Sequence, residues 1–268
     1  MGAFEPQTWH YGVVAKWWAE FNTSGPEIDY FKRFVEAGQP ALDVACGTGR
    51  LLIPYLHAGL DVDGCDISAD MIALCREQAE REGLSPNLYV QAMHELELPR
   101  KYPTIFVCGG FGVSGNREQG QVALARIYEH LEPGGTLVLD SEVPYSGSWG
   151  WDYWIKERRG ALPEPWPETG DRRVAADGSE YELRSRTVEV DPFSQQATHE
   201  MRGFIWRDGR LVEQDEQVLR STYYFPNELR LMIERAGFAD VEMRAAYTDD
   251  PPNSDTEFVV FIARKPNG

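Results

Sequence analysis

The stretch ALDVACGTGRLL, residues 41–52, joins a short apolar run to a tight glycine loop and to a pattern typical of the first turn of a helix. A glycine loop between a strand and a helix lets a ligand approach the backbone closely, because glycine carries no Cβ. Loops of this kind cradle nucleotide-like cofactors, and several different cofactors use them. The residues inside and beside the loop distinguish between these cofactors.

The loop lacks the features of the two common phosphate-binding motifs. The dinucleotide motif G-x-G-x-x-G needs a third glycine after Gly47 and Gly49, and Leu52 stands at that position. The phosphate loop G-x-x-x-x-G-K-[ST] needs a lysine, which Arg50-Leu51-Leu52 does not supply. The sequence therefore disfavours a nicotinamide dehydrogenase and a nucleoside-triphosphate site.

Two acidic residues accompany the loop. Asp43 precedes Gly47 by four residues and would repel a pyrophosphate, but it suits a cofactor that carries an ammonium and a sulfonium. Asp66 closes the next predicted strand, where it is placed to accept hydrogen bonds from two ribose hydroxyls. Each acid alone also has a structural interpretation, Asp43 as a turn cap and Asp66 as the acid before a helix. Together with the loop they describe a site for S-adenosylmethionine.

The segment 41–143 alternates predicted strands with predicted helices. Apolar runs predict strands at 41–46, 61–66, 87–92, 104–110 and 136–143, with helical patterns at 51–59, 68–83 and 117–131 and a turn at 132–135. Ser68 is a suitable N-cap for the second of these helices, and Gly83 is a suitable stop. Strands separated by helices predict right-handed crossovers and a doubly wound, mainly parallel sheet with helices on both faces.

A different pattern begins at Pro144. Residues 144–173 are rich in Pro, Gly and Trp and predict a loop with a short helix near 151–160. Three β-like runs joined by the turn sequences DPFSQQ and DGR then predict an inserted antiparallel sheet, with strands at 180–190, 197–207 and 210–224. The core pattern resumes with a helix at 226–238, which Pro226 begins and Gly237 ends, and with strands at 241–247 and 257–265.

Two further helices are predicted ahead of the glycine loop, at 17–22 and 26–38. We therefore expect an N-terminal helical segment over the active site, a core, and an insertion that acts as a lid or a dimer surface. Their boundaries are 1–40 for the helical segment, 41–143 and 225–268 for the core, and 144–224 for the insertion.

The motifs LDVACGTGRL, VDGCDISADMI and LEPGGTLVLD closely resemble those of class I S-adenosylmethionine-dependent methyltransferases. The resemblance covers about residues 41–143 and 225–264. It implies a Rossmann-like α/β fold with seven strands, the last of them antiparallel. The N-terminal helices and the sheet inserted after the fifth strand also resemble the small-molecule N-methyltransferases that act on glycine or amino sugars.

The resemblance also implies which residues hold the cofactor. Asp43, Gly47 and Gly49 would line its methionyl part, and Asp66 would hold the ribose. Many relatives have an Asp after the third strand that contacts the adenine amino group, but Ala92 stands there, so that Met93 or a backbone group would take over this contact. The other expected cofactor residues are Ala45 and Thr48 in the loop, Ile67 and Met71 near the adenine, Cys108 after the fourth strand, and Tyr11 and Trp18 from the aromatic N-terminus.

The methyl acceptor is expected near CGGFGVSGN, residues 108–116. This segment lacks the [DN]-P-P-[YF] signature, which argues against methylation of a DNA base or of glutamine. Methyl transfer is an in-line displacement that mainly requires positioning and exclusion of water, and an amine needs less help from a base than a hydroxyl does. His94, Glu142 and Tyr145 are the candidate catalytic residues, and each also has an ordinary structural interpretation.

Charge and composition limit the partners. The chain carries 26 Lys and Arg against 43 Asp and Glu, a net charge of −17, which disfavours nucleic acid and anionic membranes and favours a small neutral or cationic substrate. The four cysteines show no metal-ligand spacing, so no metal is expected. Without a signal peptide pattern or an apolar run of about 20 residues, a cytoplasmic protein is expected.

The main hypothesis is thus a small-molecule methyltransferase. The alternative is a cofactor-binding regulatory or scaffold protein, because no residue stands out as catalytic. A homodimer through the inserted sheet is a further expectation.

Overall fold

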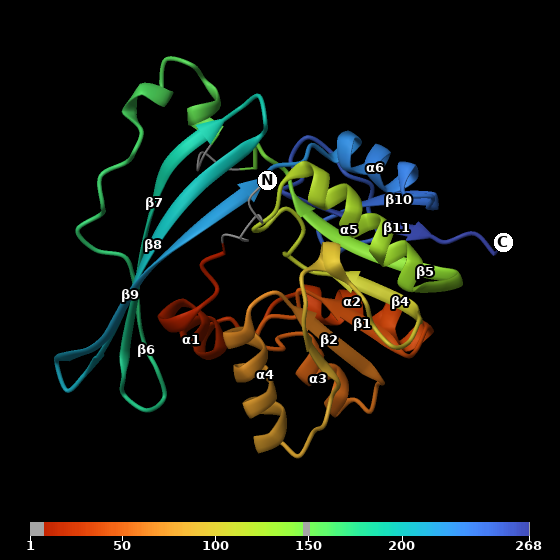
Figure 1. Cartoon of the computed structure of the whole chain (residues 1–268), viewed down its shortest axis with the longest axis horizontal. Coiled ribbons are helices and arrows are strands. Elements are labelled where there is room, and N and C mark those ends of the chain that lie inside the picture. Colours follow the sequence, from red (N-terminus) through yellow and green to blue (C-terminus); the bar gives the residue numbers. More distant parts are fainter. Residues whose placement is uncertain (1–7, 147–150, 268) are drawn as a thin grey trace. The chain divides into compact units, whose positions relative to one another are not determined.

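The computed structural model describes residues 8–146 and 151–267. The chain divides into two compact units (Figure 1). The core unit comprises 24–111, 117–146 and the described residues from 224 onward, and the accessory unit comprises the described residues within 1–23, 112–116 and 147–223. No helix in the described part of the chain is long and apolar enough to cross a membrane.

The core unit contains a seven-stranded sheet with the strand order β10-β11-β5-β4-β1-β2-β3. The strands are β1 (Ala41–Val44), β2 (Val62–Asp66), β3 (Leu88–Val90), β4 (Tyr102–Val107), β5 (Leu131–Glu142), β10 (Ala239–Ala245) and β11 (Phe258–Arg264). Strands β1 to β5 pair in parallel, whereas β11 runs antiparallel to both of its neighbours, β5 and β10. The predicted doubly wound α/β fold with seven strands and an antiparallel last strand is confirmed.

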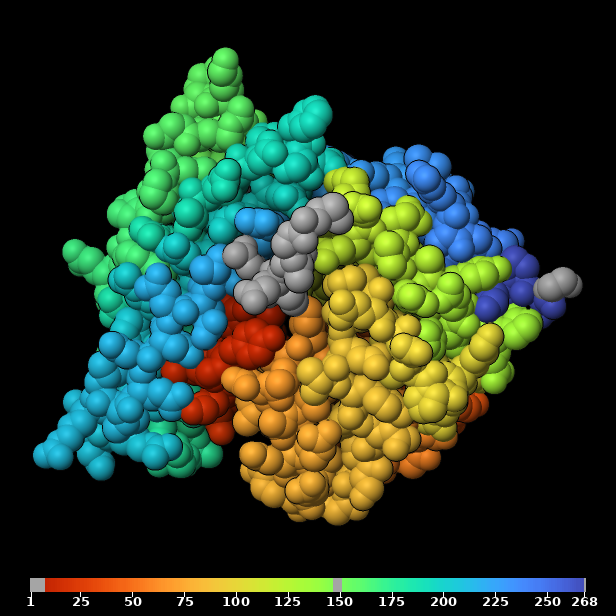
Figure 2. Space-filling model, in the orientation of Figure 1, coloured from red at the N-terminus to blue at the C-terminus, as the bar shows by residue number. Residues whose placement is uncertain are grey.

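Helices cover the two faces of this sheet, as the period-two alternation of buried side chains requires. Leu42, Ile105 and Leu137 face a cluster that includes residues of α5 (Arg117–His130) and α6 (Pro226–Arg235). Their neighbours Ala41, Phe106 and Val138 face the opposite cluster, with α2 (Glu27–Ala37), α3 (Leu52–His57) and α4 (Ala69–Arg81). The solvent side of α4 forms part of the surface in Figure 2, where it is orange.

The residues predicted to begin and end helices of the core unit lie at the ends of these helices in the structure. The Ser68 hydroxyl accepts a 3.2 Å hydrogen bond from the Met71 N–H and caps α4. Pro226 occupies the first position of α6, and Gly237 follows its end with φ +105°. The predicted turn at 132–135 is wrong in one respect, because β5 already begins at Leu131, which pairs with Tyr102 of β4. The strand is irregular there, with a register shift against β4 and φ +76° at Gly134.

The accessory unit combines α1 (Gly12–Phe21) with a four-stranded antiparallel sheet in the order β6-β7-β8-β9. The predicted runs form β7 (Glu180–Asp191), β8 (Gln196–Arg207) and β9 (Arg210–Thr222). The sheet has a fourth strand, β6 (Asp171–Val174), where the sequence predicted loop. All four of its residues are exposed, so it carries no hydrophobic alternation, and only its pairing with β7 reveals it.

Two short 3₁₀ helices, Trp151–Trp154 and Arg159–Ala161, replace the single helix predicted near 151–160. Helix α1 packs on the sheet through Val13, Val14 and Trp17, which share a buried cluster with Tyr181 and Ile205. A Cβ at Gly203 of β8 would lie 2.7 Å from the Val13 side chain, so this glycine lets the helix approach the strand closely.

Candidate functional site at the carboxyl ends of β1 and β4

Strand order places the candidate site. β1 lies between β2 and β4, and the chain order reverses at the β1/β4 pair. Ligands of open α/β sheets bind at such a switch point, beyond the carboxyl ends of the two strands, where the connecting loops separate. Here the loop after β1 is the glycine loop, and the segment after β4 begins with Cys108.

The glycine loop and the segment after β4 fit closely together. Ala45, Gly47 and Gly49 have positive φ angles of 62°, 55° and 90°. A Cβ at Gly110 would lie 2.5 Å from the Cβ of Ala45, so only glycine allows this approach. In contrast, a Cβ at Gly47 or at Gly109 would meet nothing within 4 Å. The two segments are thus in close contact at Ala45 and Gly110, whereas Gly47 and Gly109 face open space.

Asp66, at the end of β2, holds the glycine loop through its side chain. Its Oδ2 accepts a 3.0 Å hydrogen bond from the Gly47 N–H, and its Oδ1 accepts a 2.8 Å hydrogen bond from the Ser68 N–H. Burial raises the pKa of Asp66, and these backbone donors oppose the shift. The Ile67 backbone is a third donor, and a carboxylate has about four lone-pair sites, so the group can still accept a further hydrogen bond.

Asp43, in β1, is a buried carboxyl group with 3% exposure. No described residue makes a hydrogen bond or an ion pair with its side chain. Burial raises its pKa well above the usual value, and the nearby Cys75 and Asp66 add to the shift. A buried carboxylate is costly unless a cation or a donor compensates it, so this position favours a cationic ligand group.

A polar network borders the same edge, and Cys108 is its one member that the sequence analysis named as a cofactor residue. It consists of Glu27, Arg50, Cys108, Asp140 and Tyr247. Arg50 forms an ion pair with Glu27 and approaches the Cys108 Sγ through Nη2 at 3.7 Å. Asp140 accepts hydrogen bonds from the Gly109 N–H at 2.5 Å, the Cys108 thiol at 3.3 Å and the Tyr247 hydroxyl at 2.9 Å.

Part of this network could have been predicted from the alternation of side chains along β4 and β5 together with the register in which these strands pair. Phe106 pairs with Val138, and both face the same cluster as Ala41. Counting two residues onward along each strand puts Cys108 and Asp140 on that face, as Asp43 is in β1. Burial raises the pKa of Asp140, which is 2% exposed.

The residues predicted near the adenine lie beyond the ends of β2 and β3. Met71 is buried in the first turn of α4, and Ile67 is half-buried before it. Ala92 is buried and precedes a 3₁₀ turn, Met93–Glu95. His94, in that turn, lies 3.3 Å from the Gln119 side-chain nitrogen of α5. The cofactor roles of these residues and the catalytic role of His94 stay predictions.

Glu142 and Tyr145, the other candidate catalytic residues, follow the buried part of β5. Glu142 is exposed and accepts a 2.7 Å hydrogen bond from the Ser146 hydroxyl. The Tyr145 ring is 47% exposed and lies 6.3 Å from the Phe225 ring. Thr48 is buried inside the glycine loop. The structure thus brings Asp43, the loop and Asp66 together, and it keeps Glu142 at the surface of the core unit.

Tyr11 and Trp18 belong to the accessory unit. Tyr11 is the N-cap residue of α1, and the Trp18 ring lies 5.6 Å from the His10 ring. A buried polar group of this unit, His199 of β8, lies 3.5 Å from the Tyr223 hydroxyl and 6.2 Å from the Trp9 ring centre. Burial lowers the pKa of His199 to about 4. Contact of Tyr11 or Trp18 with the cofactor stays a prediction.

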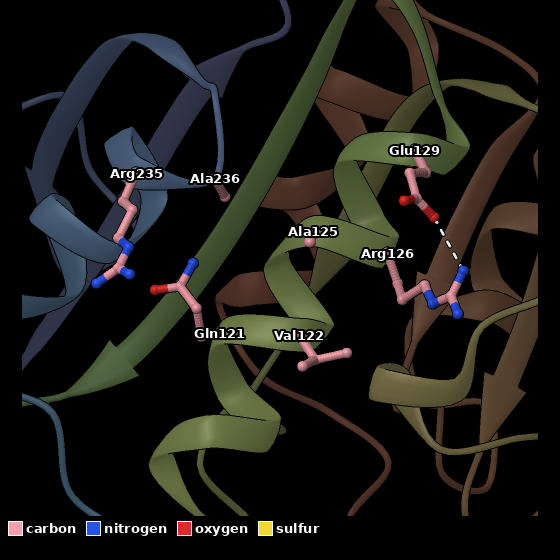
Figure 3. Close-up of a pocket in the computed structure, with 7 residues that line it drawn as sticks. All are labelled: Gln121, Val122, Ala125, Arg126, Glu129, Arg235 and Ala236. Carbon is pink, nitrogen blue, oxygen red and sulfur yellow. Dashed lines mark hydrogen bonds and ion pairs between the residues drawn. The ribbon is translucent and has the colours of Figure 1, made fainter.

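A separate depression of about 470 Å³ lies on the surface of the core unit, lined by α5 and the end of α6 (Figure 3). Its lining mixes apolar and polar side chains and includes an ion pair between Arg126 and Glu129 at 3.0 Å. None of its lining residues comes from the carboxyl ends of β1 and β4. It is therefore distinct from the candidate site.

Comparisons with known proteins agree on the type of domain. Residues 41–135 match the model of a methyltransferase domain. A putative methyltransferase of Geobacillus sp. (strain WCH70), GWCH70_2453, is 25% identical over 266 residues, which cover 95% of this chain and 99% of that protein.

Two further relatives have a stated type of substrate. The dTDP-3-amino-3,4,6-trideoxy-alpha-D-glucopyranose N,N-dimethyltransferase of Streptomyces venezuelae is 32% identical over 100 residues, which cover 37% of this chain and 40% of that enzyme. The structure of the sugar N-methyltransferase KedS8 from Streptoalloteichus sp. ATCC 53650 superposes with a TM-score of 0.67 at 19% identity, covering 99% of both chains. The latter likeness concerns the fold alone.

Proposed function

We propose that this chain, which belongs to the class I S-adenosylmethionine-dependent methyltransferases, transfers the methyl group to an amine of a small molecule. S-adenosylmethionine is the cofactor of this class of enzyme.

The observation that carries the proposed site is the buried carboxyl group of Asp43. It lies beside the glycine loop at the switch point and has no partner among the described residues. A sulfonium or an ammonium beside it would compensate its charge, whereas a pyrophosphate would be repelled. The open space above Gly47 and Gly109 offers the room that such a group needs. The residues present therefore fit this cofactor.

The remaining site residues have complementary tasks. Asp66 would accept hydrogen bonding from the ribose hydroxyls with the capacity that its backbone donors leave available. Ile67, Met71 and Met93 would cover the adenine, with a backbone group in place of an acid at Ala92. The cofactor supplies a methyl group on a positively charged sulfur. The chain's own contribution is to orient this group and the acceptor in line and to exclude water.

The charge of the site supports an amine as the acceptor. Three carboxyl groups, Asp43, Asp66 and Asp140, are buried at the carboxyl edge of the sheet. Such a site attracts a cationic ammonium, which must lose one proton before it attacks. Among the relatives with stated substrates, the amino-sugar enzyme of Streptomyces venezuelae is an N,N-dimethyltransferase and favours this acceptor, whereas demethylmenaquinone methyltransferases, one of them 34% identical over 38% of this chain, act on a different acceptor. His94, Glu142 and Tyr145 remain the proposed candidates for accepting the proton.

A transfer assay with methyl-labelled S-adenosylmethionine tests this proposal. The acceptor panel should contain nucleotide-linked amino sugars, free amino acids, hydroxy acids and phenols, with Asp43→Asn as the matched inactive control. Label in the amine products alone is the expected result. Transfer only to hydroxyl or phenol acceptors would contradict the amine assignment. Tight binding of S-adenosylhomocysteine without transfer to any acceptor would instead favour a cofactor-binding regulatory or scaffold protein.

A further inference from the structure

Arg50 is the cationic group of the polar network at the carboxyl edge of β1 and β4. It directly follows the glycine loop in the sequence, and its side chain is 17% exposed. It forms an ion pair with Glu27, at the start of α2, and its Nη2 lies 3.7 Å from the Cys108 Sγ at the end of β4. The guanidinium is therefore held between two elements that border the switch point.

The contacts of Arg50 leave part of its hydrogen-bonding capacity unused. A guanidinium has five N–H donors arranged as a planar fork. Glu27 engages Nη1, and the thiol near Nη2 is a weak acceptor. A carboxylate is the natural partner for the remaining donors, because its two oxygens match the geometry of the fork.

Arg50, a base, and Asp43, an acid, stand on the two sides of the glycine loop in the sequence. The Arg50 Nη2 lies 3.7 Å from the Cys108 Sγ, and Asp43 pairs with Phe106 of β4, so both residues lie near the end of β4. Asp43 has no partner among the described residues, and Arg50 has donors to spare. One acid and one base at the same edge are complementary to a zwitterion.

We propose that Arg50 binds the α-carboxylate of the methionyl part of S-adenosylmethionine, while Asp43 faces the α-ammonium. This inference rests on the proposed cofactor site and adds a residue to it. Glu27 is then a positioning residue, because its ion pair aims the guanidinium at the loop. The neutral amide of a glutamine at position 50 cannot replace the charge, and a lysine cannot replace the fork.

Calorimetric binding of three ligands by Arg50→Gln tests the assignment without any need for the methyl acceptor. The ligands are S-adenosylhomocysteine, its decarboxylated analogue and 5′-methylthioadenosine, which lacks the whole amino-acid tail. We expect S-adenosylhomocysteine to bind about 10- to 100-fold more weakly to the variant, because a charge-assisted hydrogen bond is lost. The other two ligands should change by less than about threefold, since they have no carboxylate to lose.

Two control variants separate a ligand contact from a structural ion pair. Arg33→Gln removes a charge from α2 whose partner is the exposed Asp249, and it should leave all three affinities unchanged. Glu27→Gln removes the ion pair but keeps the Arg50 charge, so the preference for the carboxylate-bearing ligand should persist. If Arg50→Gln does not fold, Arg50→Lys should still weaken S-adenosylhomocysteine more than the decarboxylated ligand.

Equal weakening of all three ligands by the Arg50 variants would overturn the proposal, because it would mean that Arg50 acts only through its ion pair with Glu27. Failure of the proposed function looks different, because the wild-type chain itself would then not bind S-adenosylhomocysteine.

Discussion

The Gly47 N–H donates a 3.0 Å hydrogen bond to the Asp66 carboxylate, so the loop after β1 is tied to the end of β2. The same carboxylate accepts from the Ser68 N–H at the start of α4. Asp66 thereby orders the backbone on both sides of the proposed ribose position, and its effect on binding includes this ordering as well as direct contact.

Asp66→Ala should weaken binding of S-adenosylhomocysteine by about 1–3 kcal/mol, because charge-assisted hydrogen bonds to the ribose are lost. Calorimetry measures the change, with circular dichroism to verify folding. Glu80→Ala, an exposed position on α4, is the matched control and should bind normally. Unchanged affinity in a folded Asp66→Ala variant would mean that the ribose lies elsewhere.

Gly110→Ala should destabilise the core unit by about 1–3 kcal/mol, because the new Cβ would lie 2.5 Å from that of Ala45. The glycine loop would be displaced, so cofactor affinity should fall as well. Thermal unfolding with and without S-adenosylhomocysteine measures both effects. Gly160→Ala, where a Cβ would meet nothing within 4 Å, should change neither. A wild-type melting temperature for Gly110→Ala would contradict the close approach of the two segments.

Binding of S-adenosylmethionine should release a proton, because burial raises the pKa of Asp43 and a bound cation lowers it again. Affinity should therefore increase with pH while Asp43 is protonated in the free protein, by at most about tenfold per pH unit, and level off above its raised pKa. Titrations in buffers of different ionisation enthalpy count the protons. Asp43→Asn should remove this release, and a variant that keeps it would assign the proton to another group.

The accessory unit should lose stability as the pH falls below about 6.5. Burial lowers the pKa of His199 to about 4, so the unfolded chain binds a proton more readily than the folded one in this range. The stability that neutral His199 contributes is complete above the unfolded pKa and is lost toward pH 4, by up to about 1.4 kcal/mol per pH unit. Urea unfolding between pH 4.5 and 7.5 tests this.

His199→Gln is the matching variant, and its unfolding free energy should depend less on pH over the same range than that of the wild type. An unchanged pH dependence would show that other groups cause the acid sensitivity. His10, whose pKa burial also lowers to about 4, is the first of these to examine.

Local patterns predicted most of the fold. Apolar runs, the Ser68 cap and the stop at Gly237 determine where strands and helices lie, because each depends on residues close in the sequence. The exposed strand β6 was not predicted, because its four residues show no alternation of buried and exposed side chains. It is identified by its pairing with β7. The early start of β5 likewise depends on its partner β4.

For the site, the sequence by itself determined the glycine loop and the two acids Asp43 and Asp66, because their spacing follows from one strand-loop-helix-strand unit. Only the tertiary structure decided that Glu27, Arg50, Cys108, Asp140 and Tyr247 form one network. These residues come from five separate segments of the core unit, and their contacts depend on strand order and register. Both are set by long-range packing, which no local pattern of residues encodes.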